Sequence, residues 1–328
     1  MDSRSRIIGF GAYVPERSLT NADLEALVET SDEWIVQRTG IHERRIAATA
    51  EFASDMAVRA ALDLSDRTGV ALDDVDHIIV SSFTPDHFTP TVSALVQGHF
   101  GMKAAGTFDL AAGCTGFVYA LNVADALVTA QRSRKVLVIA AETVSKAVDY
   151  TDRTTCILFG DAAAACLVVR DEQASEGVRG AFLASHFHTD GDMAQCLTCG
   201  NHSSSVNGHP APQGVVVQDG QQVYKYVTRT VPQGLACLLD EAGITVDGLD
   251  WFVPHSANMR MISVLCEKAG IPLERTLTSL RLFGNTSSAS IPLALWLAQQ
   301  EGRLKEGDTL ALYGFGGGLT QGGLIVRL

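Results

Sequence analysis

Residues 107–118 are Thr-Phe-Asp-Leu-Ala-Ala-Gly-Cys-Thr-Gly-Phe-Val, a strand-like run that turns at Gly113-Cys114-Thr115 into an apolar helical pattern ending near Ala130. A cysteine at such a turn lies at the N-terminus of the helix, where the helix dipole favours a thiolate. A neighbouring imidazole would favour the thiolate too. An isolated cysteine is more often a packed core residue, but the glycine-flanked turn favours a nucleophile. The stretch predicts an α/β fold with Cys114 as a reactive thiol.

The C-terminal half repeats this strand–turn–helix unit. A strand-like run from Leu277 leads to Asn285, and a helical pattern then continues to about Gln300. Three segments match in order, separated by 174, 171 and 174 residues: Asp76 with Asp250, Cys114 with Asn285, and Val136 with Leu310. Strand–turn–helix units resemble one another in any α/β protein, which is the alternative explanation. The nearly constant separation favours two copies of one unit, which we assign to residues 1–172 and 173–328.

Two polar residues of the second unit also come directly after strand-like runs, and in the register of the repeat His255 falls opposite Ser81 and Asn285 opposite Cys114. His255 follows Trp-Phe-Val-Pro, and Asn285 lies between two small residues. Ligands of α/β sheets collect at the carboxyl ends of strands, so two related copies would bring Cys114, His255 and Asn285 to one central point. Taken singly, the histidine would be a core residue and the asparagine a helix N-cap. Together they predict an active site.

A glycine-rich segment, Phe315-Gly316-Gly317-Gly318, follows another strand near the C-terminus. It is no dinucleotide-binding fingerprint, because only one more strand follows it and no βαβ unit. Consecutive glycines let backbone N–H groups approach a substrate closely, as an oxyanion hole requires.

Composition limits the function classes. The chain has 328 residues, 46% hydrophobic content and a formal net charge of −12. This length allows about two domains, and the charge argues against nucleic-acid and anionic-membrane binding. An anionic substrate would need a local basic patch. Without a signal-peptide pattern or a membrane-spanning run, and with seven cysteines mostly in apolar runs, we expect a cytoplasmic protein with reduced thiols.

The region from about His186 to Pro212 is polar and rich in glycine and serine, which predicts a loop or an insertion. It contains Cys196-x-x-Cys199 with several histidines nearby. A structural zinc site needs four regularly spaced ligands, and one cysteine pair does not supply them. We therefore expect no metal, and leave the role of this loop open.

These motifs resemble those of β-ketoacyl-acyl carrier protein synthase III, a member of the thiolase-like superfamily, over essentially the whole chain. The shared blocks are Thr20-Asn-Ala-Asp-Leu-Glu, Ser31-Asp-Glu-Trp-Ile-Val-Gln-Arg-Thr-Gly-Ile, Tyr150-Thr-Asp-Arg-Thr-Thr, Phe159-Gly-Asp-Ala-Ala, Val253-Pro-His-Ser-Ala-Asn, Gly284-Asn-Thr-Ser and Phe315-Gly-Gly-Gly. The resemblance implies a thiolase-like duplicated fold of five layers, α-β-α-β-α, with a nucleophile half at 1–172 and a second half at 173–328. It also implies a homodimer.

The resemblance further implies a decarboxylating Claisen condensation of an acyl-CoA primer with malonyl-acyl carrier protein, initiating bacterial fatty acid synthesis. Cys114 matches the nucleophile that takes the acyl group. His255 and Asn285 match the pair that binds the malonyl thioester carbonyl, and the N–H groups of Cys114 and Gly317 match the oxyanion hole. Two neutral donors can stabilise an enolate without a metal, so no cofactor is expected.

Substrate-binding positions are also implied by the resemblance. Residues that match contacts of coenzyme A are Trp34, Arg38, Arg153, Gly220 and Asn258. Residues that match the basic patch receiving the acidic carrier protein are Lys225, Arg260 and Lys268. Without the resemblance, the tryptophan would be a packing residue of a helix face, and the basic side chains would be solvated surface charges.

Three positions depart from the common pattern of the family. Thr89 stands where many relatives carry a phenylalanine that closes the acyl pocket of the neighbouring subunit, so we expect primers longer or more branched than acetyl. Gly113-Cys114-Thr115 replaces Ala-Cys-Ala, which affects local packing. Gln221 replaces an asparagine of the pantetheine path.

Three other functions stay open at this stage. One is a specialised condensing enzyme that transfers acyl or aryl groups in secondary metabolism. A second is an acyl-CoA hydrolase in which water replaces the second substrate. A third is a non-catalytic acyl-binding protein, against which the combination of Cys114, His255 and Asn285 argues, because a binder needs no such set.

Overall fold

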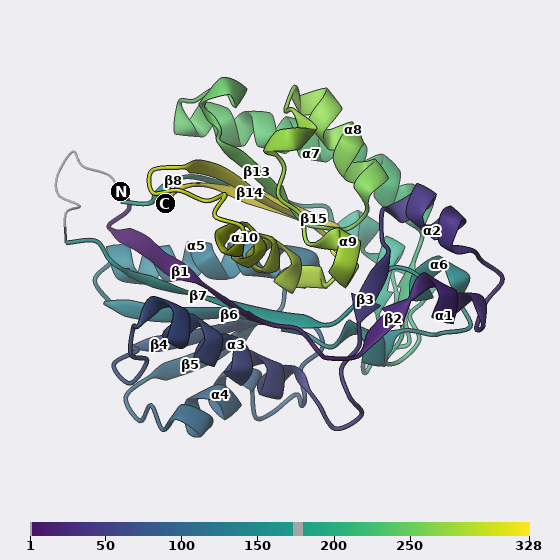
Figure 1. The fold of residues 1–328 in the computed structure, drawn as a ribbon, viewed down its shortest axis with the longest axis horizontal. Helices are drawn as coiled ribbons and strands as arrows, with labels where there is room; N and C mark the ends of the chain where they lie inside the picture. The colour runs from purple at the N-terminus through teal and green to yellow at the C-terminus, as the bar shows by residue number, and fades with distance from the viewer. Residues whose placement is uncertain (1, 173–179) are drawn as a thin grey trace.

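Two mixed β-sheets organise the chain in a computed structural model that describes residues 2–172 and 180–328 (Figure 1). The first sheet has the order β1-β7-β6-β4-β5. Its strands are β1 (Ser5–Tyr13), β7 (Ala162–Arg170), β6 (Lys135–Glu142), β4 (His77–Ser81) and β5 (Gly106–Leu110). The second sheet has the order β13-β14-β15-β8. Its strands are β13 (Trp251–Pro254), β14 (Thr309–Gly316), β15 (Thr320–Arg327) and β8 (Phe182–Thr189).

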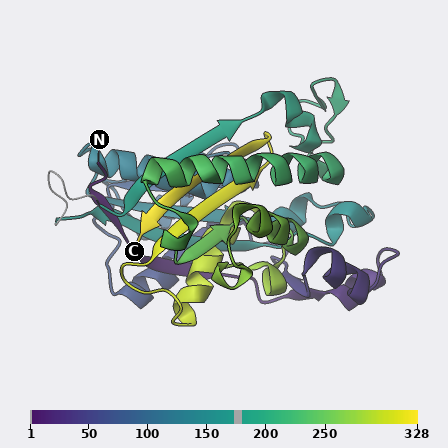
Figure 2. The same ribbon diagram turned by 90° about the horizontal axis from the view of Figure 1, so that it is seen from above.

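Helices form three layers around these sheets. Two pack on the outer face of the first sheet, two lie between the sheets, and two cover the second sheet (Figure 1). In that order they are α3 (Ala53–Thr68) and α4 (Val92–Phe100), α5 (Gly116–Thr129) and α10 (Ser290–Gln300), and α7 (Gly220–Ala242) and α8 (Met259–Ala269). Figure 2 shows α7 lying along the second sheet. The predicted α-β-α-β-α layering is confirmed.

Burial explains the composition of each layer. The central helix α5 is apolar on nearly all sides because it packs against strands of both sheets, and Phe117, Leu121 and Val128 are fully buried. Helix α7 has one buried side, since its other side faces solvent. Strand β7 begins with Ala162-Ala-Ala-Ala, whose small side chains let helices on both faces of the first sheet pack closely.

The pairing registers match the internal duplication. His77 of β4 pairs with Val136 of β6 in parallel, and Trp251 of β13 pairs with Leu310 of β14 in parallel. In both cases the partner lies 59 residues further along the chain. Each sheet then continues through two antiparallel strands, β7 and β1 in the first and β15 and β8 in the second. The boundary predicted at 172/173 adjoins residues 173–179, which lie outside the described residues.

One predicted strand is wrong. The run from Leu277 was expected to match β5, but only an isolated parallel bridge between Phe252 and Thr276 forms. Leu277 still donates its N–H to the Phe252 carbonyl at 2.9 Å. The N–H of Ser279 goes instead to the Ser256 hydroxyl at 3.1 Å, and the chain then turns into the short helix α9 (Leu280–Phe283). The ladder cannot continue because its next donor is bound to a side chain.

The region from His186 to Pro212 is also more ordered than predicted. His186 and His188 belong to β8, which pairs with β15. Other residues of this region belong to two small two-stranded sheets, one of which is completed by a strand beyond Pro212. They consist of β9 (Leu197–Cys199) with β12 (Val216–Gln218), and β10 (Ser205–Val206) with β11 (His209–Pro210). The pattern missed them because backbone pairing, rather than an apolar face, holds such short strands.

The remaining elements are short. They are β2 (Ser18–Thr20), β3 (Glu43–Arg45), α1 (Asn21–Glu25), α2 (Asp32–Thr39), α6 (Arg153–Cys156), and the 3₁₀ turns η1 (Gly113–Thr115), η2 (Val144–Ala147), η3 (Gly191–Cys196), η4 (Val246–Gly248), η5 (Leu273–Arg275) and η6 (Ser287–Ala289). Two of the 3₁₀ turns, η1 and η6, are buried at the centre of the chain. Of the helices that the structure describes, none is both long enough and apolar enough to cross a membrane.

Candidate active site

Cys114, His255 and Asn285 line one cavity of about 150 Å³ between the two halves of the chain. Cys114 lies in η1 directly before α5, His255 follows β13, and Asn285 lies just before η6. All three side chains are buried. The structure therefore brings together the three residues that the duplicated pattern predicted to meet.

The surroundings of the Cys114 thiol act on its pKa in the direction opposite to the one expected for the N-terminus of a helix. Burial raises its pKa to about 11, and the negative charge of Glu142 acts in the same direction. Hydrogen bonds from the Ser287 hydroxyl and from the backbone of Cys114 and Gly317 lower it by less. Removing the thiol from water outweighs these contacts because the thiolate is the charged form.

His255 is held as a neutral hydrogen-bond donor. Its backbone N–H donates to Tyr313 at 2.8 Å, and its Nδ1 lies 2.7 Å from the Ser290 hydroxyl. That hydroxyl also accepts the Ser256 N–H at 3.2 Å, so the backbone next to His255 and its ring are held by the same serine. Burial lowers the His255 pKa to about 3, although a hydrogen bond with the Ser287 backbone opposes this.

Asn285 is oriented by its neighbours. Its side-chain oxygen accepts the Ser287 N–H at 2.9 Å, which leaves both protons of its amide nitrogen available to a ligand. Its backbone N–H donates to the Leu158 carbonyl at 2.8 Å, and its carbonyl accepts the Gly160 N–H at 3.0 Å. A segment of the first half thus fixes a residue of the second half.

Glycines permit the close approach of β14 to the nucleophile. A Cβ at Gly316 would lie 2.8 Å from the Cys114 Cβ and 2.9 Å from its sulfur, so no side chain fits there. The next residue, Gly317, directs its backbone towards the thiol. Gly113 has a φ of 50°, a left-handed conformation that suits glycine. Gly113, which stands where the family commonly has alanine, therefore suits the backbone conformation at this position.

Cys114 also lines a second cavity, of about 230 Å³, which we call the acyl-side cavity. Its lining is mostly apolar and includes Phe83, Phe159, Leu197 and Val216. The cavity with His255 and Asn285 shares Gly220, Tyr224 and Asn258 with a pocket of about 290 Å³ that also contains Arg38, Lys225 and Arg260. The thiol thus lies where an apolar cavity meets a path that leads to basic residues.

The comparisons with known proteins agree along the whole chain. The family model described as 3-oxoacyl-[acyl-carrier-protein (ACP)] synthase III matches residues 108–191, and the model of its C-terminal part matches residues 239–328. A beta-ketoacyl-[acyl-carrier-protein] synthase III 2 of Halalkalibacterium halodurans is 52% identical over 99% of this chain and 97% of the relative. The chain belongs to this synthase III family.

Solved structures of the synthase III family show the same fold. The enzyme of Thermus thermophilus superposes with a TM-score of 0.93 at 41% identity, covering 98% of this chain and 99% of that one. The enzyme of Aquifex aeolicus superposes with a TM-score of 0.91 at 38% identity, covering 99% and 100%. These values confirm the thiolase-like fold.

The residues expected to contact coenzyme A lie near the basic end of the path. Gly220 and Asn258 line it, with Asn258 also capping α8 through the Arg260 N–H at 2.9 Å. The guanidinium groups of Arg38 and Arg153 lie 5.8 and 5.2 Å from the centre of the half-buried Trp34 ring. The indole therefore already interacts with cations, and an adenine would have to share or replace these contacts.

The residues expected to receive the carrier protein are only partly together. Lys225 and Arg260 are exposed and line the pocket at the basic end of the path. Lys268 lies at the other end of α8 and donates to the Thr228 carbonyl at 2.7 Å. Two of the three charges are thus adjacent, and the third is tied to α7.

The structure also places Thr89 and the Cys196-x-x-Cys199 loop relative to the thiol. Thr89 is exposed and is not among the residues lining either cavity at Cys114 of its own chain. Cys199 lines the acyl-side cavity, whereas Cys196 is buried in the core under α7. Within residues 2–172 and 180–328, no three histidine, cysteine or acidic side chains come close enough to hold a metal ion.

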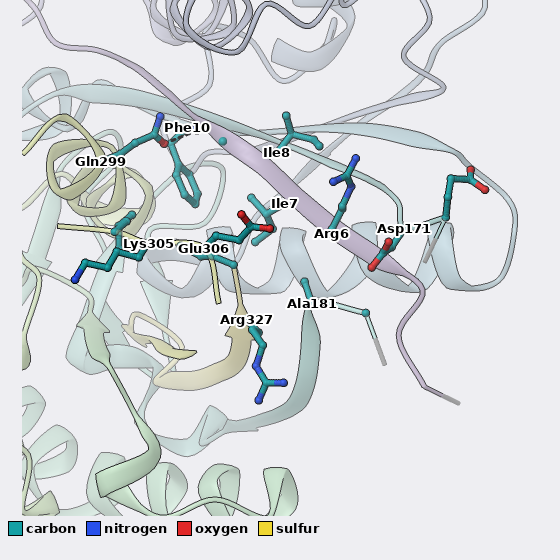
Figure 3. A pocket seen from close by; sticks show the side chains of 15 residues that line it. Arg6, Ile7, Ile8, Phe10, Asp171, Ala181, Gln299, Lys305, Glu306 and Arg327 are labelled. Atoms are coloured by element: carbon teal, nitrogen blue, oxygen red, sulfur yellow. Dashed lines mark hydrogen bonds between the residues drawn. The ribbon is translucent and has the colours of Figure 1, made fainter. Parts of the chain in front are cut away.

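A larger cavity, of about 680 Å³, lies near the chain ends and is separate from the site (Figure 3). Around it Figure 3 shows Arg6 and Arg327 together with Asp171 and Glu306. The charges have both signs, and the described residues that line the cavity include no cysteine or histidine. Its described lining therefore offers no thiol and no clear charge preference for a thioester substrate.

Sequence reasoning missed three residues that contact the site: Ser287, Ser290 and Glu142. Ser287 donates to the Cys114 sulfur at 3.6 Å, and Ser290 contacts His255. Glu142, at the end of β6, accepts the Ser288 hydroxyl at 2.6 Å. The hydroxyl-rich run Asn-Thr-Ser-Ser-Ala-Ser at residues 285–290 was a usable signal, because such a run is unusual at the start of an apolar helix.

Proposed function

We propose that this chain condenses an acyl-CoA primer with malonyl-acyl carrier protein, releasing carbon dioxide, through an acyl group carried on Cys114. The product would be a β-ketoacyl-acyl carrier protein, the first condensation product of fatty acid synthesis. One observation carries the proposal: a buried thiol and two neutral donors, His255 and Asn285, line one cavity. Full-length similarity to enzymes named beta-ketoacyl-[acyl-carrier-protein] synthase III supports it.

The first step transfers the acyl group. The Cys114 sulfur attacks the thioester carbonyl of acyl-CoA, and the coenzyme A sulfur leaves and takes up a proton. Backbone N–H groups of Cys114 and Gly317 are the proposed donors to the oxyanion. The acyl chain then occupies the apolar acyl-side cavity, while Arg38 and Arg153 beside Trp34 offer positive charge to the phosphates of coenzyme A.

The second step generates the carbon nucleophile. Loss of carbon dioxide from the malonyl group leaves an enolate on the thioester oxygen, and Nε2–H of His255 with the amide of Asn285 would stabilise it. Both donors are neutral, and they are already oriented by Ser290 and Ser287, so little reorganisation is needed. The enolate carbon attacks acyl-Cys114 and releases its sulfur. This chemistry needs no cofactor.

The acidic carrier protein would dock at the basic end of the path. Lys225 and Arg260 are exposed there, next to the route that leads to Cys114. In a chain of net charge −12, such a local patch attracts an acidic partner that the remaining surface repels.

A homodimer and a cytoplasmic location complete the proposal. Strand β5 is an edge strand that pairs only with β4 among the described strands, so its other edge is available to a second copy. Phe88, next to Thr89, is 67% exposed, an unusual position for a large apolar side chain unless a partner covers it.

The seven cysteines are free thiols, as expected in a reducing compartment.

Replacing Thr89 by phenylalanine is expected to shift primer preference towards acetyl-CoA. In a dimer of the proposed kind, the larger side chain would fill part of the partner's acyl pocket. The ratio of kcat/KM for acetyl-CoA to that for a branched or longer acyl-CoA should rise about tenfold or more. Thr89→Ser is the matched control and should keep the original ratio. An unchanged ratio in Thr89→Phe would show that Thr89 does not limit the pocket.

Intact-protein mass spectrometry tests the proposed function directly. The protein is mixed with acyl-CoAs of increasing length and branching, and malonyl-acyl carrier protein is then added. We expect a covalent acyl adduct that is discharged to a β-ketoacyl product. Steady release of coenzyme A without the malonyl substrate would indicate a hydrolase. If no thioester leaves an adduct, the proposal fails.

A further inference from the structure

Glu142 is a buried carboxylate beside the active site that the reaction described above does not use. It ends β6 and is fully buried. One oxygen accepts the Ser288 hydroxyl at 2.6 Å, and the other accepts the Thr84 hydroxyl at 2.9 Å and the Phe83 N–H at 3.1 Å. Burying a carboxylate costs free energy, which these hydrogen bonds offset. A buried acid so close to the nucleophile is therefore a candidate for a role in the reaction.

Ser287 connects this carboxylate to the nucleophile. Its hydroxyl donates to the Cys114 sulfur at 3.6 Å, the next residue, Ser288, donates to the Glu142 carboxylate at 2.6 Å, and the Ser287 side chain is itself among the groups that lower the Glu142 pKa. Ser287 has a φ of 50°, which is uncommon for a residue other than glycine. The backbone thus accepts some strain to keep a hydroxyl at this point.

A serine hydroxyl has one proton and can donate to one neighbour at a time. When that proton turns from Cys114 towards Glu142, the Ser287 oxygen is free to accept the proton of the thiol. Such a rotation of the hydroxyl would connect the sulfur to the carboxylate through two successive proton transfers.

We propose that Ser287 and Glu142 form a proton relay that activates Cys114 for acyl transfer. The inference rests on the proposed function, since it assigns a base to the first step of that reaction. Ser287 touches the reacting sulfur and is a catalytic residue. Glu142 acts through Ser287 as the final proton acceptor.

The ionisation of the surrounding groups supports this assignment. Burial raises the Cys114 pKa to about 11, so few molecules carry a thiolate at neutral pH without a base. His255 is a poor acceptor, because burial lowers its pKa to about 3. Burial raises the Glu142 pKa to about 7, against the lowering effect of its hydrogen bonds. A base with a pKa near the working pH is the most effective one.

The proton balance closes over the full cycle. In acyl transfer, the thiol proton passes to Ser287 while the Ser287 proton passes to Glu142, and the sulfur bonds to the acyl carbon. The coenzyme A sulfur leaves with the electrons of the broken bond and takes a proton from solvent. After condensation, the released Cys114 sulfur regains its proton from Glu142 through Ser287.

Keeping Glu142 protonated also helps the second step. A carboxylate beside the site would oppose the negative charge of the enolate, and a neutral carboxylic acid does not. The negative charge of Glu142 raises the pKa of two neighbouring thiols, Cys114 in η1 and Cys199 in β9. The other neighbours of the carboxyl, in residues 82–84 and in η6, contribute hydroxyls and one N–H.

The test follows acyl-adduct formation from acyl-CoA alone by rapid quench and intact mass, between about pH 5 and pH 10. In the wild type the rate should rise with pH through about 7, where Glu142 becomes the carboxylate, and then level off. In Glu142→Gln and Ser287→Gly it should fall about a hundredfold at neutral pH. Their rates should then climb without levelling, since Cys114 must ionise unaided.

Ser287→Gly removes the hydroxyl and suits the left-handed backbone, so a lost rate cannot be ascribed to strain. Ser288→Ala tests the relay through the midpoint of the pH profile, which would not change if Glu142 had only a structural role. It removes a hydrogen bond that lowers the Glu142 pKa, so the midpoint of the pH profile should shift upward. An unshifted midpoint in Ser288→Ala overturns the relay even if Glu142→Gln does not fold.

The relay is also overturned if Glu142→Gln and Ser287→Gly acylate at the wild-type rate with the wild-type profile. Recovery of their adduct at high pH supports it, because the nucleophile and the substrate site are then intact. Absence of any adduct in the wild type would overturn the proposed function itself, and the relay with it. The two failures are therefore distinguishable.

Discussion

Replacing Cys114 by alanine is expected to abolish the acyl adduct and to lower condensation by at least about ten-thousandfold, the scale of losing a covalent nucleophile. The expectation follows from the position of the sulfur, where the acyl-side cavity meets the path to the basic residues. Intact mass after incubation with acyl-CoA, and product formation after addition of malonyl-acyl carrier protein, measure the two losses.

The control for this substitution is another cysteine. Cys237 is exposed on α7 and lines none of these cavities, so Cys237→Ala should retain both the adduct and the product. Decarboxylation of malonyl-acyl carrier protein should persist in Cys114→Ala, because its donors remain. An adduct of normal yield in Cys114→Ala would assign the nucleophile to another side chain, and Cys199 of the acyl-side cavity would be the first to test.

His255→Ala and Asn285→Ala are expected to show the opposite pattern. Each removes one donor to the enolate, so decarboxylation of malonyl-acyl carrier protein should fall by about 10²–10³-fold. The acyl adduct on Cys114 should still form, because neither side chain is assigned to the first step. Release of labelled carbon dioxide and the intact mass of the protein report the two steps separately.

The neutral state of His255 adds a pH criterion. With a pKa lowered to about 3 by burial, the imidazole keeps the same protonation state throughout the neutral range. The dependence of decarboxylation on His255 should therefore be the same at mildly acidic and mildly basic pH. His209, exposed on β11, provides the matched control in His209→Ala. Equal loss of acylation in His255→Ala would mean that the histidine serves the thiol rather than the enolate.

Local pattern was sufficient for the architecture and for the three central residues. The strands of the two parallel pairs are continuous apolar runs, and α5 and α10 are apolar because they lie between two sheets. Glycines and polar residues at the ends of those runs marked Cys114, His255 and Asn285. Such features can be predicted from one sequence because each depends on a few neighbouring residues.

Pattern failed where a distant group competed for a backbone donor. The run at Leu277 has the composition of a strand, but Ser256 captures the Ser279 N–H and the ladder stops. The short strands β9 to β12 were missed for a related reason, since their pairing partners, rather than their own periodicity, define them. A sequence records residue types and not which donor meets which acceptor.

By itself, the sequence determined that two α/β units with reactive residues at their strand ends make up this protein, since strand, turn and helix preferences act over short distances. Only the tertiary structure decided that burial raises the pKa of Cys114 and lowers that of His255, and that Ser287 and Glu142 lie beside the thiol. The physical reason is that protonation depends on burial and on neighbouring charges, and the two halves of the chain create both only when they pack together.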